Sequence, residues 1–420
     1  MKKNLYIIIY PYKFTNFIWE LNELDSFLKY TDVQVLDISK IINFEFSQNI
    51  AAKNIIRKEV IYISTVLALI SYIRNLKVKS SYTNICIYDE IPKNSMICLT
   101  IKWILFLYLK DTKIKCFDSF NSGVPIIYSK EIAQNKNGGS AKIVLSKLFS
   151  LLKSFSNTKE FKVKIFFYFS NNLSNLIPSV LTHHFIAGKH YKIYAQKKNK
   201  YLKRFIYGHS FDYSNYLKLR DRAKIKVKNN YKTSIFLDGA GPLFKSDSFY
   251  TKRSVPFTTE VWYPALTNFF DFLEKNTGVT VDVAGHYKST HISPAPIFGY
   301  RNVIYGETLM LVKKSDYVIT RCSSAISFAV LYRKPILFIF SDQLIQDNEV
   351  MRHINGMAEM LGTKPINIDH FSDDINNYLK VNEKKYREYE NNFLTSNSSG
   401  RQNYQIILED IMKIPTDISL

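Results

Sequence analysis

The chain has 420 residues, of which 46% are hydrophobic and 15% aromatic, and its formal net charge at pH 7 is +21. A chain of this length is too long to fold around one ordinary hydrophobic core, which predicts two domains. The hydrophobic content excludes an intrinsically disordered chain. So large a positive charge favours anionic partners such as a lipid surface or an acidic ligand, unless it serves only to solvate the surface.

The lysines are spread along the chain, and no nucleic-acid-binding motif occurs, so we expect no nucleic-acid partner. The four cysteines (Cys86, Cys98, Cys116 and Cys322) lack metal-ligand spacing, which favours free thiols in a reducing cytoplasm. Cys322 lies in a polar turn, where packing is favoured over a nucleophilic role because no base is near it in sequence.

The first apolar run, Leu5–Tyr10, stops at Pro11 without a small-residue cleavage site, so we interpret it as a β-strand and not a signal peptide. The most apolar window, Met96–Leu109, is interrupted by Lys102 and is too short to span a membrane. We therefore expect a cytoplasmic protein, soluble or peripheral at the inner face of the cell membrane.

The first half alternates short apolar runs with helix-like segments at Phe17–Tyr30 and Ser64–Leu76, a pattern typical of an α/β domain. We predict a first domain over residues 1–215, with a surface loop at 134–140. The apolar runs are Leu5–Tyr10, Val33–Ile38, Val60–Ile63, Ile85–Tyr88, Ile114–Phe117, Val163–Phe169 and His184–Ala187.

Residues 216–232 are highly charged and precede a new strand at Ser234–Leu237, which predicts an interdomain linker. A second α/β domain is expected over 233–370. Residues 371–420 follow with helical patterns at Ile375–Phe393 and Tyr404–Met412.

The second domain carries polar residues where its apolar runs stop. Val281–Ala284 is followed by Gly285-His286, and Tyr317–Thr320 is followed by Arg321-Cys322-Ser323-Ser324. In open α/β sheets, ligands bind at the carboxyl ends of the strands, often with phosphate at a following helix N-terminus. This segment therefore predicts half of a nucleotide-binding site.

The order G-H-x-K-S, F-G-Y-R, a Thr-containing helix, S-S-A-I-S-F-A-V-L and K-P-I resembles bacterial GT-B glycosyltransferases. It is most similar to those that transfer sialic-acid-like or Kdo-like (nonulosonic) sugars from CMP donors in capsule and lipopolysaccharide synthesis. The resemblance implies two Rossmann-type domains facing a cleft, with C-terminal helices crossing back to the first domain. It also implies a lipid-linked or surface-polysaccharide glycan as acceptor.

One departure leaves the donor class open, because the His-Pro of those enzymes is His286-Tyr287 here, without the rigid turn of proline. The alternatives are a UDP- or GDP-sugar transferase of the same architecture and a non-catalytic polysaccharide-assembly protein.

The resemblance points to His286 as a donor to the leaving phosphate, with His291 as a substitute. Ser323 and Ser324 are expected at an anion site, or as caps of the next helix, and Arg321 adds positive charge beside them. Further donor-side candidates follow in the sequence. Arg301 suits a carboxylate or phosphate but is equally consistent with a surface residue. Glu307 and Thr308 would contact the donor or cap a helix.

Two carboxylates compete for the role of catalytic base. Asp118 follows a strand of the first domain, where the related enzymes place an acidic motif, although the second acid and the glycine of that motif are missing. Asp238 lies in D-G-A-G, where Gly239 and Gly241 allow close approach of a ligand or simply form a turn. We place Asp118 first, because a two-domain transferase usually takes its base from the acceptor side.

The polar cluster at 209–213 is interpreted as a structural hinge. No D-x-D, H-E-x-x-H or P-loop occurs. We therefore expect no metal and no cofactor other than a nucleotide-sugar cosubstrate.

Overall fold

The computed structural model describes residues 3–42, 55–79, 81–92, 96–110, 112–120, 180–198, 204–220, 232–239, 241–243, 257–286, 297–371 and 375–416. The segments expected at 134–140 and Val163–Phe169, and the candidate His291, lie outside these residues.

The first domain is built on a parallel seven-stranded sheet with the order β3-β2-β1-β4-β5-β6-β7. Six strands confirm the predicted apolar runs, and β7 was not predicted. The strands are β1 Lys3–Tyr10, β2 Asp32–Asp37, β3 Val60–Tyr62, β4 Tyr82–Asp89, β5 Lys115–Phe120, β6 His183–Ala187 and β7 Phe205–Gly208.

The apolar runs form central strands because both faces of the sheet are covered. Along β1, Tyr6 and Ile8 enter one core cluster, whereas Leu5, Ile7 and Ile9 enter the other. The helices of this domain are α1 Asn16–Leu21, α2 Leu24–Phe27, α3 Ser39–Ile42, α5 Val66–Lys79, α6 Met96–Leu109, α10 Lys189–Lys198 and α11 Phe211–Arg220.

The prediction of a single helix over Phe17–Tyr30 is wrong, because this segment forms two helices, α1 and α2, which are separated at Glu23. This residue has a left-handed backbone, with φ of 56°. Its buried carboxylate accepts hydrogen bonds from the Ser214 hydroxyl and from the Tyr404 N–H. Partners nearly 200 and 400 residues away therefore decide where this helix breaks.

The second domain has a parallel six-stranded sheet with the order β10-β9-β8-β11-β12-β13. Counted along each sheet, both domains have the 3-2-1-4-5-6 order of Rossmann folds, and the first adds one strand. The strands are β8 Thr233–Leu237, β9 Thr280–Gly285, β10 Val303–Tyr305, β11 Tyr317–Thr320, β12 Ile336–Phe340 and β13 Ile366–Asn367.

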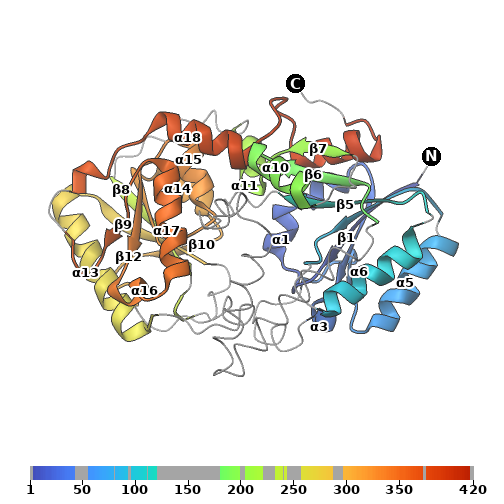
Figure 1. The fold of residues 1–420 in the computed structure, drawn as a ribbon, viewed down its shortest axis with the longest axis horizontal. Helices are drawn as coiled ribbons and strands as arrows, with labels where there is room; N and C mark the ends of the chain where they lie inside the picture. The colour runs from blue at the N-terminus through green and yellow to red at the C-terminus, as the bar shows by residue number, and fades with distance from the viewer. Residues whose placement is uncertain are drawn as a thin grey trace, which may run out of the picture.

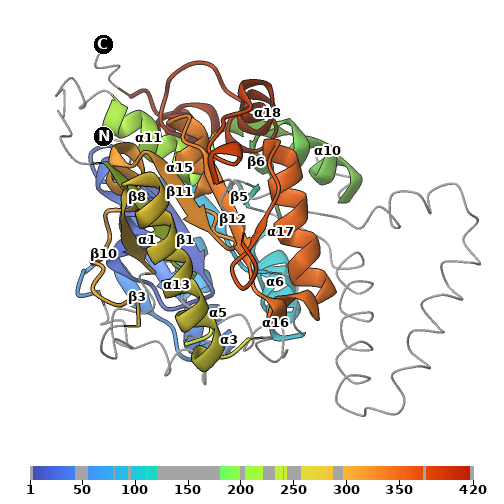
Figure 2. The ribbon, with the colours of Figure 1, turned by 90° about the vertical axis from the view of Figure 1, so that its left-hand side faces the viewer.

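Helices cover both faces of this sheet, and Figure 2 shows α13 and α17 on opposite sides of it. α13 buries a row of aromatic and leucine side chains, and α17 begins at an Asp347 cap and ends at Gly362 in the left-handed region. The helices are α13 Thr259–Thr277, α14 Thr308–Lys314, α15 Ile326–Leu331, α16 Asp342–Ile345 and α17 Asn348–Leu361.

The C-terminal segment crosses back to the first domain, as the resemblance implied (Figure 1). The helix expected over Ile375–Phe393 is instead a 3-10 turn (η2 Ile375–Asn377), α18 Glu383–Tyr389 and a π-helix (η3 Glu390–Leu394). The next segment, α19 Asn403–Ile406 and η4 Ile407–Met412, buries its apolar side chains in the core of the first domain.

Polar contacts hold this crossing in place. The Asn84 amide donates to the Met412 carbonyl at 2.7 Å, and Lys115 Nζ donates to the Ile411 carbonyl at 2.6 Å. The two-domain GT-B architecture predicted from the sequence is confirmed. α11 extends through position 220, into the expected linker, and residues 221–231 of that linker lie outside the described part.

The polar cluster at 209–213 lies at this crossing. His209 is fully buried; its Nδ1 lies 2.8 Å from Thr395 Oγ1, and its Nε2 lies 2.9 Å from the Arg401 carbonyl. The Asn403 side chain pairs with the backbone of His209 through two hydrogen bonds of 3.0 Å. Burial lowers the pKa of His209 to about 4, so this imidazole is neutral at pH 7.

Candidate active site

A cavity of about 960 Å³ lies between the two domains, lined by residues from both sheets. Its walls are formed where parallel strands end, at β4 and β5 of the first domain and at β8 and β9 of the second. Much of the remaining wall comes from α1, α11 and the segments that open α14 and α15. Ligands of open α/β sheets bind at this kind of edge.

The structure brings His286, Ser323, Ser324 and Thr308 to this one cavity. β9 ends at Gly285, so His286 directly follows the strand. Ser323 and Ser324 follow β11 in a turn that precedes α15. The imidazole and the two hydroxyl residues are far apart in the chain, and the parallel strands β9 and β11, which flank β8, place them at the same edge of the sheet.

Neither serine is the N-cap of α15. The cap residue is Ala325, which has no side-chain capping hydrogen bond, and its N–H donates to Ser323 Oγ at 3.3 Å. Ser327, one turn further, donates from its hydroxyl to the Ser324 carbonyl at 3.0 Å.

Gly285 must be glycine for a packing reason. A Cβ at this position would lie 2.4 Å from Cε1 of the Tyr305 ring, which packs across the end of β9. Since Gly285 and Gly306 both line the cavity, the backbone itself forms part of its floor.

Asp118, on β5, lines the cavity from the opposite domain and pairs with His184 on β6. The two residues are register partners on neighbouring parallel strands, so their side chains lie on the same face of the sheet. His184 is wholly buried, whereas the Asp118 carboxylate keeps partial access to the cavity. The sequence analysis did not identify His184, and only strand pairing reveals it.

Asp238, the competing carboxylate, also lines the cavity at the end of β8 and is largely buried. Gly239 and Gly241, in the segment after Asp238, lie beside the cavity and not on its wall, and so does Arg321, which follows β11. The Arg321 guanidinium stacks on the Phe257 ring at 4.9 Å, and Gly239 and Gly241 lie against the same guanidinium.

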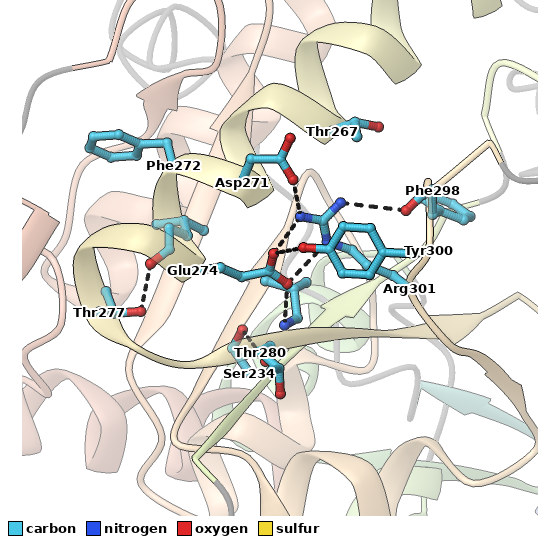
Figure 3. A network of polar contacts seen from close by, with 12 residues as sticks. Ser234, Thr267, Asp271, Phe272, Glu274, Thr277, Thr280, Phe298, Tyr300 and Arg301 are labelled. Atoms are coloured by element: carbon cyan, nitrogen blue, oxygen red, sulfur yellow. Dashed lines mark hydrogen bonds and ion pairs between the residues drawn. The ribbon is translucent and has the colours of Figure 1, made fainter.

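Arg301 is not brought to the cavity, which corrects its expected role in donor binding. Its buried guanidinium pairs with Asp271 at 2.6 Å and with Glu274 at 2.7 Å, both on α13 (Figure 3). The ring of Tyr300 lies 4.8 Å from it. Two carboxylates and an aromatic face satisfy this arginine, so its role is to join α13 to the segment before β10. Glu307, exposed at the start of α14, is also outside the cavity wall and makes no capping bond.

Acidic residues that the sequence analysis missed line the same cavity. Asp89 ends β4 and pairs with Lys102 Nζ of α6 at 2.6 Å. Its neighbour Glu90 has a buried Oε1 without a hydrogen-bond partner in the described residues. Asp212, in the first turn of α11, and Glu20, on α1, complete the set.

Burial decides the charge of two of these acids. Desolvation raises the pKa of Glu90 to about 8 and that of Asp212 to about 7, although a hydrogen bond to Tyr88 or Ser327, respectively, opposes the shift. At pH 7 Glu90 is mainly protonated and Asp212 is divided between its two forms. Within the described residues, the wall holds six carboxyl groups, two lysines and one histidine, and no arginine.

Within the described residues, no group of three or more histidine, cysteine or acidic side chains could hold a metal ion. None of the described helices has the length and apolar character needed to cross a membrane.

No protein-family model and no curated protein matches the chain. Several solved structures have a similar fold. A putative UDP-N-acetylglucosamine 2-epimerase from Listeria monocytogenes is 10% identical, with a TM-score of 0.46, over 98% of both chains. S. aureus MnaA, in a structure with UDP, is 11% identical with a TM-score of 0.43, over 98% of this chain and 96% of that one. The wall teichoic acid polymerase TagF (H548A) is 11% identical with a TM-score of 0.49, over 98% of this chain and 89% of that one. These similarities assign no activity to this chain, whose GT-B fold follows from its strand order and its crossing C-terminal helices.

Proposed function

We propose that this protein is a glycosyltransferase that takes a nucleotide-sugar donor and transfers the sugar to a hydroxyl group of a glycan acceptor. One observation carries the proposal: His286, Ser323 and Ser324 of one domain share a cavity with Asp118 of the other. Sugar transfer requires donors to a leaving phosphate on one side and an acceptor for the hydroxyl proton on the other.

The donor phosphates would lie on the wall of the second domain. The Ser323 and Ser324 hydroxyls and nearby backbone N–H groups offer hydrogen-bond donors there, and His286 can donate a proton or a hydrogen bond to the leaving phosphate. Thr308, at the start of α14, is a further donor on the same wall.

Asp118 would accept the proton of the acceptor hydroxyl. His184 acts on it as a positioning residue, because its Nδ1 contacts the carboxylate from the buried side and fixes its orientation. Asp238 is the alternative base, on the opposite wall of the same cavity.

The charge of the cavity favours a neutral sugar. A nonulosonic sugar carries a carboxylate, which would face the carboxyl groups of Asp89, Asp118 and Asp238 without an arginine on the described wall. We therefore propose a UDP- or GDP-linked neutral sugar in preference to the CMP-linked acidic sugar expected from the sequence. UDP, the nucleotide in the similar S. aureus structure, is the first one to test.

The acceptor would bind against the first domain. Carboxyl oxygens on this wall, including those of Asp89 and Asp118, are acceptors for sugar hydroxyl groups. A lipid-linked glycan is the proposed class, presented at the inner face of the cell membrane. An anionic leaflet would attract the basic protein by about 1 kcal/mol per lysine or arginine near it.

The test combines nucleotide binding with turnover. At a concentration one hundred times the dissociation constant, UDP should stabilise the protein by about 2.7 kcal/mol, measured as a thermal shift. His286→Ala and Ser324→Ala should lose most of that shift, whereas the exposed control His370→Ala should keep it. If neither UDP, GDP nor CMP shifts the melting temperature, the proposed donor site is wrong.

Turnover distinguishes an enzyme from the alternative, a non-catalytic assembly protein of the same fold. With nucleotide-sugars and a panel of glycan acceptors, Asp118→Asn should lower kcat at least about a hundredfold while the nucleotide thermal shift remains. His184→Gln should lower kcat less and change the pH profile, because it acts through Asp118. Nucleotide binding without transfer from any donor would favour the assembly protein.

A further inference from the structure

The outer face of α6 carries large apolar side chains, although it faces solvent. The exposed residues 97, 100, 103 and 107, with 110 just beyond the helix, recur every three or four positions and form one stripe, in which Ile97, Trp103 and Leu107 are apolar. Trp103 is 50% exposed and Leu107 is 44% exposed. The outer face of a helix in a globular protein is normally polar, so this stripe requires an explanation.

The exposed stripe is separate from the side of α6 that packs in the hydrophobic core. The opposite face of α6 is fully packed against the first sheet by Cys98, Ile101, Leu105 and Leu109. α6 thus carries large apolar side chains on both its buried and its exposed side, and packing within the domain accounts for only the buried side.

The neighbouring helix extends the same surface. α5 and α6 lie side by side on one face of the first sheet (Figure 1), and Leu67 at the start of α5 is 77% exposed. Both helices follow parallel strands of one sheet, so their N-termini lie at the strand edge that carries the cavity.

The charged residues of this surface are all basic. Arg74 stacks on the Tyr108 ring at 5.3 Å, and Lys110 lies 5.8 Å from the Phe106 ring. Neither α5 nor α6 contains an aspartate or glutamate. Helices that lie in the interface of an anionic membrane have this composition: exposed tryptophan and leucine side chains, bordered by basic residues and without acidic ones.

We propose that the outer face of α5 and α6 docks on an anionic phospholipid bilayer. Trp103, Leu107 and Leu67 enter the headgroup region, while Arg74 and Lys110 contact lipid phosphates. A second copy of the chain fits this face less well, because a two-fold contact would bring its cations against one another with no acid to pair them. Lys102, on the same helix, reaches the cavity through Asp89, so docking would place the active site beside the bilayer.

This inference extends the proposed function, in which the acceptor is lipid-linked, but its test needs neither donor nor acceptor. The chain has three tryptophans; Trp19 and Trp262 are 1% and 2% exposed. A fluorescence blue shift on adding vesicles therefore reports on Trp103. Trp103→Phe should remove the shift while co-sedimentation with the vesicles persists.

The full-length protein is mixed with vesicles of phosphatidylglycerol and phosphatidylcholine, or of phosphatidylcholine alone, and binding is measured by co-sedimentation. We expect binding to the anionic vesicles, weakened at high salt. Trp103→Ser combined with Leu107→Ser should lower partitioning at least about tenfold. Arg74→Ala with Lys110→Ala should reduce the preference for anionic lipid.

The matched control is Ile345→Ser, which removes an equally exposed apolar side chain from α16 of the second domain. It should bind vesicles like the unchanged protein. The melting temperature of each variant without ligand confirms that it is folded. UDP thermal shifts, measured separately, distinguish a failure of docking from a failure of the proposed function.

The proposal is overturned if the unchanged protein does not bind anionic vesicles. It is also overturned if the Trp103/Leu107 double variant binds them as well as Ile345→Ser does. A dimer on gel filtration that the double variant abolishes, without vesicle binding, would assign the face to self-association instead.

Discussion

At the scale of single residues, the cavity stands out for its acids. The protein carries a net charge of +21, yet six carboxyl groups and three basic side chains line the cavity in the described residues. Burial keeps Glu90 and Asp212 partly protonated near neutral pH, which limits the mutual repulsion of the six groups. The same two acids can then donate as well as accept hydrogen bonds toward a sugar.

The raised pKa of Asp212 makes a prediction about stability and pH. The folded carboxyl holds its proton up to about pH 7, whereas in the unfolded chain it ionises near 3.8. Unfolding then releases a proton, so this group lowers the free energy of unfolding as pH rises from about 4 to 7. Asp212→Asn should be more stable than the unchanged protein at pH 8, on the order of 2 kcal/mol.

The measurement is urea unfolding of both proteins between pH 4 and 8.5. The difference should shrink as the pH falls toward 4, because the unfolded carboxyl regains its proton near 3.8. A difference that stays constant over the whole range would mean that lost packing, and not ionisation, separates the two proteins.

At the scale of elements, the crossing of the C-terminal segment depends on a small polar junction. Asn403 opens α19, and its side chain holds the backbone N–H and carbonyl of His209, which follows β7. The Asn403 N–H also donates to Ser214 Oγ at 2.9 Å, and Ser214 in turn donates to Glu23. Asn403 therefore connects α19 with β7 through its side-chain amide, and with α11 and the break between α1 and α2 through its backbone N–H.

Asn403→Ala should destabilise the protein by about 2–3 kcal/mol, because it leaves two buried backbone groups of His209 without partners. Chemical denaturation measures this loss. Asn276→Ala removes an exposed amide that donates to the Phe272 carbonyl near the end of α13 and should cost less than about 0.5 kcal/mol. Equal effects of the two substitutions would contradict a structural role for the junction.

At the scale of the whole molecule, the last helix belongs to the first domain although it follows the second in sequence. Ile406, Leu408, Ile411 and Met412 are buried in the same cluster as Tyr6 and Tyr88 of the first sheet. The chain therefore returns to its first domain, which is complete only with residues beyond 400.

Ile411→Ala should lower the free energy of unfolding of the first domain by about 2–4 kcal/mol, through lost burial and the cavity that remains. Hydrogen exchange, followed by peptide, should show faster exchange in β1 and β4 than in β8 and β11. The exposed Ile345→Ala is the control and should leave both sheets unchanged. Equal loss of protection in the two sheets would show that the domains unfold as one unit.

The sequence alone determined the two α/β domains, most of the strands, and the placement of His286, Ser323 and Ser324 at strand ends of the second domain. It could do so because burial on both sheet faces produces continuous apolar runs, and because ligand residues directly follow those runs in the chain. These signals are local, so they survive without knowledge of the fold.

Only the tertiary structure decided the partners of each side chain. Arg301 has the residue type of a phosphate ligand, but Asp271 and Glu274 hold it away from the cavity. Asp118 acquires His184 because β5 and β6 are neighbours in register, and 66 positions separate the two residues in the chain. Pairings of this kind depend on strand order and chain crossing, which leave no periodic trace in the sequence.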